Sequence, residues 1–221
     1  MKITFYLMTK KGFEVLNMII KNDLQHFISE VVFGKDNNVD NDFSNEISSL
    51  CKQNNLNYFE RKEEYKINSD YSFAVSWRWL IPETNSKLIV LHDSILPKYR
   101  GFSPLVNMLI NEEPEIGVSA LFATSEYDKG DIIAQSSTKI DYPITISEAI
   151  EVVSKNYCEL VIKIINTLKE KGKVVAFPQK EEFATYSLWR NEEDYLINWQ
   201  NSSDEILRFI NAVSSPYKGA S

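Results

Sequence analysis

An apolar run passes directly into a polar turn in the stretch Leu88-Ile89-Val90-Leu91-His92-Asp93-Ser94-Ile95-Leu96-Pro97-Lys98-Tyr99-Arg100-Gly101. Four consecutive apolar residues before a turn predict a short buried strand. Because His92 follows that strand directly, the turn should project its ring at the rim of a sheet. A histidine at such a rim can accept or donate protons near neutral pH.

Strands and helices alternate on both sides of this stretch. Apolar runs predict strands over residues 2–8, 28–33, 73–76, 87–91, 117–123 and 131–140. Apolar residues at helical spacing predict helices around residues 13–20, 47–51, 146–168 and 206–210. The alternation predicts an α/β fold: a Rossmann-like, mainly parallel sheet with helices on both faces. Ligands bind beyond the carboxyl ends of the strands in such sheets, so residues 91–101 lie at a candidate site.

The pattern changes after Lys173. Residues 174–177 predict a short strand, residues 186–199 are polar and rich in aromatic side chains, and a last helix follows. We therefore expect a main domain over residues 1–173 and a small closing subdomain over residues 174–221 that packs on it.

The composition argues against several classes of protein. Thirty-one acidic against 24 basic residues give a net charge of −7 without an apparent basic cluster, so nucleic-acid binding is not expected. No signal sequence or run of membrane-spanning length is apparent, so we expect a cytoplasmic protein without a membrane partner. Cys51 and Cys158 are interpreted as buried thiols. His26 is the one histidine besides His92, so no metal site is expected.

A second polar turn lies between two predicted strands, with the sequence Tyr127-Asp128-Lys129-Gly130-Asp131. Gly130 allows a backbone conformation that other residues resist. Asp128 could therefore reach the same rim as His92.

Taken together, these motifs resemble those of the formyltransferases that use 10-formyltetrahydrofolate. That family reads His-x-Ser-Leu-Leu-Pro-x-x-Arg-Gly, then Gly-Val-Thr, then Asp-x-Gly-x-Ile. This chain matches it at residues 92–101, at Gly117-Val118 and at residues 128–132. A second block, with Gln179 and residues 184–186, 197–199 and 212–220, looks like the end of the catalytic domain in aminosugar formyltransferases and methionyl-tRNA formyltransferase. Because the resembling proteins continue into further strands, we expect the closing subdomain to continue beyond Ser221.

The resemblance implies the transfer of a formyl group to a primary amine, with 10-formyltetrahydrofolate as cosubstrate. It places His92 and Asp128 at the reacting centre. The residues it implies for the folate are Leu80, Ile81, Pro82, Arg100, Thr124 and Tyr127, and those for the acceptor are Trp77, Arg78, Trp79 and Ser94. Packing in the core remains an alternative for Leu80, Ile81 and the tryptophans. Arg100 could instead brace its loop against an acidic residue such as Asp93.

One position departs from the resembling family, which has an asparagine two residues before the histidine where this chain has Val90. Valine offers no hydrogen bond to the oxyanion that forms when an amine attacks a formyl group. Loss of one such donor typically lowers the rate by about two to three powers of ten. The sequence is therefore compatible with a slower or rearranged enzyme, or with an inactive relative.

The resemblance leaves three functions to weigh. The Trp-Arg-Trp segment and the acidic charge favour an acceptor amine on a nucleotide-linked deoxysugar, of the kind used for bacterial surface glycans such as lipopolysaccharide. A methionyl-tRNA formyltransferase is second, although a basic surface and a C-terminal RNA-binding domain would be expected of it. The third is a non-catalytic or formyl-folate-hydrolysing relative. The sequence leaves a homodimer possible for each of these functions.

Overall fold

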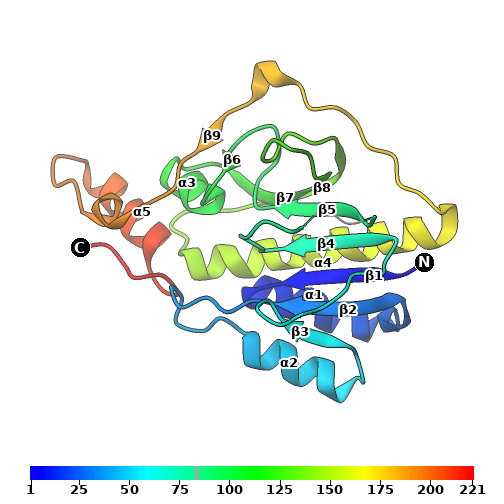
Figure 1. Cartoon of the computed structure of the whole chain (residues 1–221). Helices are drawn as coiled ribbons and strands as arrows, with labels where there is room; N and C mark the ends of the chain where they lie inside the picture. Colours follow the sequence, from blue (N-terminus) through cyan, green and yellow to red (C-terminus); the bar gives the residue numbers. More distant parts are fainter. Residues whose placement is uncertain (83–84) are drawn as a thin grey trace.

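The main sheet has seven strands and is mostly parallel. A computed structural model describes residues 1–82 and 85–221 of the chain. The strands are β1 (Ile3–Leu7), β2 (Ile28–Phe33), β3 (Tyr58–Glu60), β4 (Tyr71–Val75), β5 (Lys87–His92), β7 (Glu115–Phe122) and β8 (Ile132–Lys139). They are ordered β3-β2-β1-β4-β5-β7-β8; those from β3 to β5 run parallel, and β7 and β8 pair antiparallel at one edge (Figure 1). The predicted α/β class and mainly parallel sheet are confirmed.

The α-helices in the described residues are α1 (Thr9–Lys21), α2 (Ser44–Gln53), α3 (Pro104–Ile110), α4 (Ile146–Lys171) and α5 (Ser203–Val213). The longest, α4, begins with a capping box between Thr145 and Glu148 and ends at Gly172, whose φ of 71° suits a glycine. No helix within residues 1–82 and 85–221 combines the length and apolar character needed to cross a membrane. Cys51 of α2 and Cys158 of α4 are buried free thiols, as predicted.

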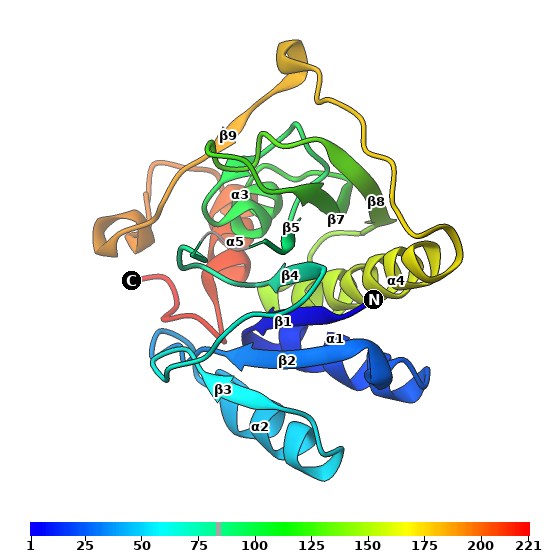
Figure 2. The same cartoon turned by 45° about the vertical axis from the view of Figure 1, so that its right-hand side comes forward.

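The two faces of the sheet differ in what covers them. On one face, alternate strand residues such as Phe5, Phe73 and Ile89 join a continuous apolar core with Leu16 of α1 and Val161 of α4. α2 belongs to the same core. The helices expected on both faces of the sheet are therefore unevenly distributed, because α1, α2 and α4 lie together behind the strands (Figures 1 and 2). Because strand residues alternate between faces, their neighbours point the other way.

This second face carries more polar and small side chains than the first, although Tyr6 and Val32 are buried on it. Thr4 of β1 is buried there; its hydroxyl donates to the carboxylate of Glu30 at 2.7 Å and lies 2.9 Å from the hydroxyl of Ser69. Ser72 and Ala74 of β4 also lie on this face, outside the apolar core. The sheet therefore offers one face to the core and keeps the other available for a polar site.

The closing part of the chain crosses back over the carboxyl end of the sheet. The short strand β9 (Tyr186–Ser187) pairs with β6 (Arg100–Gly101) in a separate two-stranded sheet. Short 3₁₀ helices are formed by residues 25–27, 181–183 and 192–195. α5 packs against α3, and Arg208 of α5 forms an ion pair of 3.1 Å with Glu112.

The prediction of a strand over residues 174–177 is wrong. Only Phe177 forms an isolated bridge, exchanging backbone hydrogen bonds of 2.8 and 2.9 Å with Ile132. The apolar side chains of Val175 and Phe177 stay 63% and 66% exposed, so burial does not reward a longer pairing. Pro178 follows and lacks the N–H that a ladder needs.

A substitution at Gly117 of β7 tests the tight packing beneath the site. A Cβ atom at this residue would meet the backbone oxygen of Ser136 on β8 and the side chain of Ile95. We expect Gly117→Ala to lower the free energy of unfolding by about 1–3 kcal/mol, because neither strand can move away cheaply. Urea denaturation measures this change. Gly172→Asn is the control, because no atom lies within 4 Å of an added Cβ and asparagine tolerates its positive φ; an equal loss in both variants would contradict the packing argument.

Candidate active site

A cavity of about 2050 Å³ opens at the carboxyl ends of the parallel strands. It is lined by residues that follow β1, β2, β4 and β5, by the β7–β8 connection, and by the end of the chain around Tyr217. Pockets for one small ligand usually measure about 300–1,000 Å³. The cavity therefore has room for two ligands side by side.

The structure brings the predicted pair His92 and Asp128 together at this cavity. His92 is the last residue of β5 and is 8% exposed. Its Nδ1 atom lies 3.5 Å from Oδ1 of Asp128, and its Nε2 atom lies 2.8 Å from the backbone oxygen of Tyr99. Both ring nitrogens thus face oxygen acceptors. A neutral imidazole has one N–H, so both contacts are hydrogen bonds only when the ring carries a second proton.

Hydrogen bonds hold Asp128 in position. Its φ is +56°, and its Oδ2 atom accepts the backbone N–H of Gly101 at 2.9 Å. The side-chain amide of Gln179 donates to the backbone oxygens of Asp128 at 2.7 Å and of Gly130 at 2.8 Å. Gly130 is required here, because a Cβ atom would meet the backbone oxygen of Phe122. Gln179 is therefore a positioning residue. The sequence indicated it only as part of a motif.

Arg100 lies beside this turn and outside the cavity lining. Its guanidinium donates to Gln179 Oε1 at 2.8 and 3.1 Å and to the carboxylate of Glu181 at 2.6 and 2.8 Å. The side chain is 1% exposed. Arg100 therefore braces the closing segment against the site, and its acidic partner is Glu181 rather than Asp93.

Ser94 also lies outside the cavity lining. It is fully buried, and its hydroxyl donates to the backbone oxygen of Lys98 at 2.7 Å. The loop after β5 thus turns this hydroxyl toward its own backbone. A direct contact with the acceptor, as predicted for Ser94, is not available in this conformation.

Five of the six residues predicted for the folate line the cavity, namely Leu80, Ile81, Pro82, Thr124 and Tyr127. Leu80 is 82% exposed and Tyr127 is 70% exposed. Residues packed in a core are not exposed to this extent. These side chains leave a partly apolar surface free at the mouth of the cavity.

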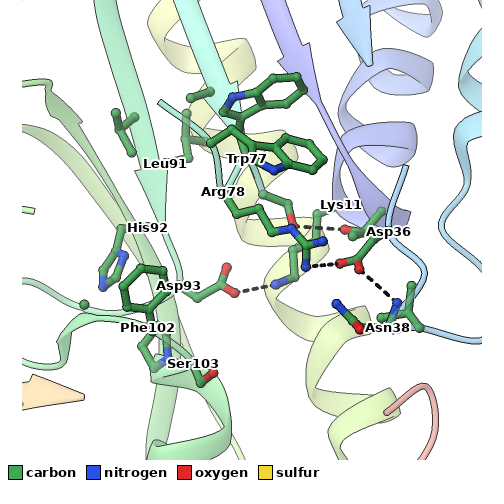
Figure 3. A pocket seen from close by; sticks show the side chains of 18 of the residues that line it. Lys11, Asp36, Asn38, Trp77, Arg78, Leu91, His92, Asp93, Phe102 and Ser103 are labelled. Atoms are coloured by element: carbon green, nitrogen blue, oxygen red, sulfur yellow. Dashed lines mark hydrogen bonds and ion pairs between the residues drawn. The ribbon is translucent and has the colours of Figure 1, made fainter. Parts of the chain in front are cut away.

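The Trp-Arg-Trp segment forms an edge-to-face aromatic pair at the cavity wall. The rings of Trp77 and Trp79 meet edge to face at 5.1 Å, and the Arg61 guanidinium lies 4.3 Å from the Trp79 ring. Arg78 forms an ion pair of 3.0 Å with Asp36, which follows β2 (Figure 3). All three residues of the segment line the cavity.

A buried ion pair joins Lys11 of α1 to Asp93, and both residues line the cavity (Figure 3). Burial alone would raise the pKa of the Asp93 carboxyl, but the Lys11 ammonium outweighs burial and lowers that pKa. Burial alone would likewise lower the pKa of Lys11, and Asp93 raises it. Both groups are therefore charged at neutral pH. Nothing in the local sequence predicted this pair.

Val90 faces the cavity on the same side of β5 as His92, because side chains two residues apart in a strand share a face. It is partly exposed and adds an apolar surface where the resembling family has an amide. Among the described residues, no group of three or more His, Cys, Asp or Glu side chains is arranged to hold a metal ion.

A parallel α/β sheet with a histidine–aspartate pair beyond its strand ends is the arrangement that the sequence motifs predicted. The chain belongs to the formyl transferase family, whose model matches residues 43–165. The matched range includes both His92 and Asp128. The resemblance inferred from the motifs is confirmed at the level of the family.

Two relatives share about a third of their aligned residues with this chain. The bifunctional polymyxin resistance protein ArnA of Wigglesworthia glossinidia brevipalpis is 31% identical over 219 residues, which are 96% of this chain and 32% of that protein. A methionyl-tRNA formyltransferase of Fusobacterium nucleatum is 32% identical over 183 residues, which are 76% of this chain and 58% of that protein. This chain thus spans a third to three fifths of the length of these relatives.

The fold is shared with solved structures, one of which has two ligands bound. It is an N-formyltransferase from Helicobacter canadensis in complex with folinic acid and dTDP-3-aminofucose, with a TM-score of 0.76 and 22% identity over 96% of this chain and 80% of that chain. At this identity the likeness establishes the fold.

Gln179 provides a test of how the Asp128 turn is held. Gln179→Ala removes the donor to two backbone oxygens and the acceptor for Arg100. We expect it to lower the free energy of unfolding by about 1–3 kcal/mol, since buried polar groups lose their partners. Urea denaturation measures the loss, and the exposed Gln200→Ala is the control. Equal stability of both variants would show that water replaces the Gln179 amide without cost.

Proposed function

We propose that this protein transfers the formyl group of 10-formyltetrahydrofolate to a primary amine on a nucleotide-linked amino-deoxysugar. The observation that carries the proposal is the His92–Asp128 pair, fixed at the edge of a cavity that is large enough for two ligands. Membership of the formyl transferase family supports the reaction class.

The reaction forms one C–N bond and breaks another. The acceptor ammonium loses a proton, the free amine attacks the formyl carbon, and the carbonyl oxygen becomes an oxyanion. The bond to the folate nitrogen then breaks, and that nitrogen takes up a proton while the acceptor nitrogen loses its second. The products are a formamide, tetrahydrofolate and one proton.

His92 and Asp128 are suited to move these protons. His92 can take a proton from the amine and return it to the folate nitrogen, and the Asp128 carboxylate orients its ring. The oxyanion needs separate donors. The Ser94 hydroxyl is engaged with Lys98, and both His92 ring nitrogens face protein oxygens. Backbone N–H groups are therefore the donors that remain from those considered in the sequence.

The two ligands are assigned to different parts of the cavity lining. The exposed side chains of Leu80 and Tyr127 and the backbone near Thr124 suit the flat pterin of a folate. Another part of the lining carries Arg78 and the edge-to-face Trp77–Trp79 pair, which suit the phosphates and the sugar of a nucleotide-linked acceptor. The Helicobacter canadensis protein of the same fold binds a folate and a nucleotide-linked aminosugar together.

Formylation of methionyl-tRNA is the second candidate, and the Fusobacterium nucleatum relative favours it. The formal net charge of −7 argues against it, because a tRNA backbone is repelled by an acidic surface. A sugar nucleotide carries far fewer phosphates than a tRNA.

The role of His92 is tested by following tetrahydrofolate release with 10-formyltetrahydrofolate and dTDP-3-aminofucose as the trial acceptor. We expect His92→Ala to lower the rate by about 10²–10⁴-fold, the usual contribution of a general acid–base group. His26→Ala, which changes the exposed histidine of the 3₁₀ helix at residues 25–27, should leave the rate unchanged. Full activity of His92→Ala would remove His92 from the mechanism. A thermal shift with folinic acid serves as an independent check of folate binding.

Val90 is tested by restoring the amide. If the site lacks only an oxyanion donor, Val90→Asn should raise the rate by up to about 10²-fold. Leu88→Asn is the matched control, because Leu88 lies two residues earlier on the same face of β5 and also lines the cavity. An increase in both variants, or in neither, would show that position 90 does not limit the rate.

A further inference from the structure

The two ring nitrogens of His92 have different partners. Nε2 lies 2.8 Å from the backbone oxygen of Tyr99, which is an ordinary hydrogen-bond distance. Nδ1 lies 3.5 Å from Oδ1 of Asp128, which is beyond the usual range of about 2.7–3.2 Å. A backbone oxygen can only accept, so the contact at Nε2 requires a proton on that nitrogen. Neutral His92 therefore carries its proton on Nε2 and its free lone pair on Nδ1.

The two nitrogens also face different parts of the molecule. Asp128, on the Nδ1 side, lines the cavity together with His92. Tyr99, on the Nε2 side, lies outside the cavity lining and packs against the apolar core. The lone pair of the neutral ring is thus on the edge that shares the cavity with Asp128.

Tyr99 has an unusual backbone conformation. Its φ is +58°, a left-handed value that is rare for a bulky residue. Such conformations persist only where the surrounding structure fixes them, and they cluster at active sites. The loop after β5 therefore adopts this conformation for a reason other than the preference of its own residue.

Three hydrogen bonds fix Tyr99 in this conformation. Its backbone N–H donates to Oγ1 of Thr185 at 2.9 Å. Its hydroxyl donates to the Glu113 carboxylate at 2.7 Å and accepts from the Asn111 amide at 3.0 Å. Burial and the contact with Glu113 raise the pKa of this hydroxyl, so it stays a donor at neutral pH. With its N–H and its side chain both held, the carbonyl of Tyr99 is directed at His92.

We propose that Tyr99 is a positioning residue that holds His92 by its Nε2 proton, so that Nδ1 is the nitrogen that exchanges protons with the substrates. This inference rests on the proposed function. An N–H bond of the attacking amine breaks and an N–H bond forms at Nδ1. The same proton then passes to the folate nitrogen as the bond from that nitrogen to the formyl carbon breaks.

A loop that is merely stabilised by Tyr99 would show the same hydrogen bonds. Such a role would affect stability but not the position of the proton on the His92 ring. The decisive measurement is therefore ¹⁵N NMR of protein labelled at histidine, because protonated and unprotonated ring nitrogens differ in chemical shift. The chain contains two histidines, so the spectrum of His26→Ala assigns the signals of His92.

At about pH 9, where ordinary imidazoles are neutral, we expect the Nε2–H form of His92 to exceed the Nδ1–H form by about 10-fold. Tyr99→Phe/Thr185→Val removes the hydrogen bonds of the hydroxyl and of the N–H, and should lower this ratio about fivefold. The same variant should lower kcat for formyl transfer by about 10-fold and leave both KM values unchanged, because Tyr99 contacts neither ligand.

Two controls separate positioning from stability. Thr185→Ser keeps the oxygen that accepts from Tyr99, so its tautomer ratio and kcat should match those of the unchanged protein. Tyr142→Phe removes a hydroxyl that donates to the backbone oxygen of the same Glu113 at 2.9 Å, and it should also leave both quantities unchanged.

A predominant Nδ1–H form in the unchanged protein would overturn the assignment. A lower kcat in Tyr99→Phe/Thr185→Val without a change in the tautomer ratio would also overturn it, and would leave Tyr99 a structural role only. The NMR measurement needs no substrate, so the two proposals can fail separately. Formyl transfer with His92 in the Nδ1–H form refutes this inference alone. Absence of formyl transfer in the unchanged protein refutes the proposed function, and the role of Nδ1 with it.

Discussion

The geometry of the His92–Asp128 pair depends on one hydrogen-bonded junction between the loops that follow β5 and β7. The N–H of Gly101 donates to the Asp128 carboxylate, and Gln179 donates to the backbone on both sides of Lys129. Gln179 is in turn held by the buried guanidinium of Arg100. The 3.5 Å approach of Asp128 to His92 thus relies on the docking of the closing segment as much as on the sheet.

The unequal faces of the sheet explain why the site can be polar without weakening the core. Ile89 and Leu91 of β5 point into the core between the sheet and α4, whereas Val90 and His92 point to the cavity. Apolar burial stabilises a fold by roughly 25 cal/mol per Å². With that contribution concentrated behind the strands, the opposite face can carry small and polar side chains such as Ser72 and Ala74 and leave space for ligands.

Much of this arrangement could be predicted from sequence, because short apolar runs mark parallel strands and place the residues after them at one edge. His92 and Asp128 follow from that rule. The helix α3 was not predicted, because a helix of seven residues is too short for its helical period to stand out. The contacts of Lys11 and Gln179 could not be predicted for another reason. Their partners lie 82 and 51 residues away in the sequence, so only the folded chain brings them together. Ser94 and Arg100 lie on the predicted loop, but their side chains point away from the cavity.

Under the proposed function, Val90 and the His92–Asp128 pair bear on different steps of the same reaction. An amide at position 90 would act on the oxyanion, where one donor typically contributes about 10²–10³-fold. A positioned acid–base pair contributes about 10²–10⁴-fold, which is no smaller. Under the proposed function, loss of the amide alone would therefore leave a site able to catalyse, provided that the amine reaches His92 as the free base.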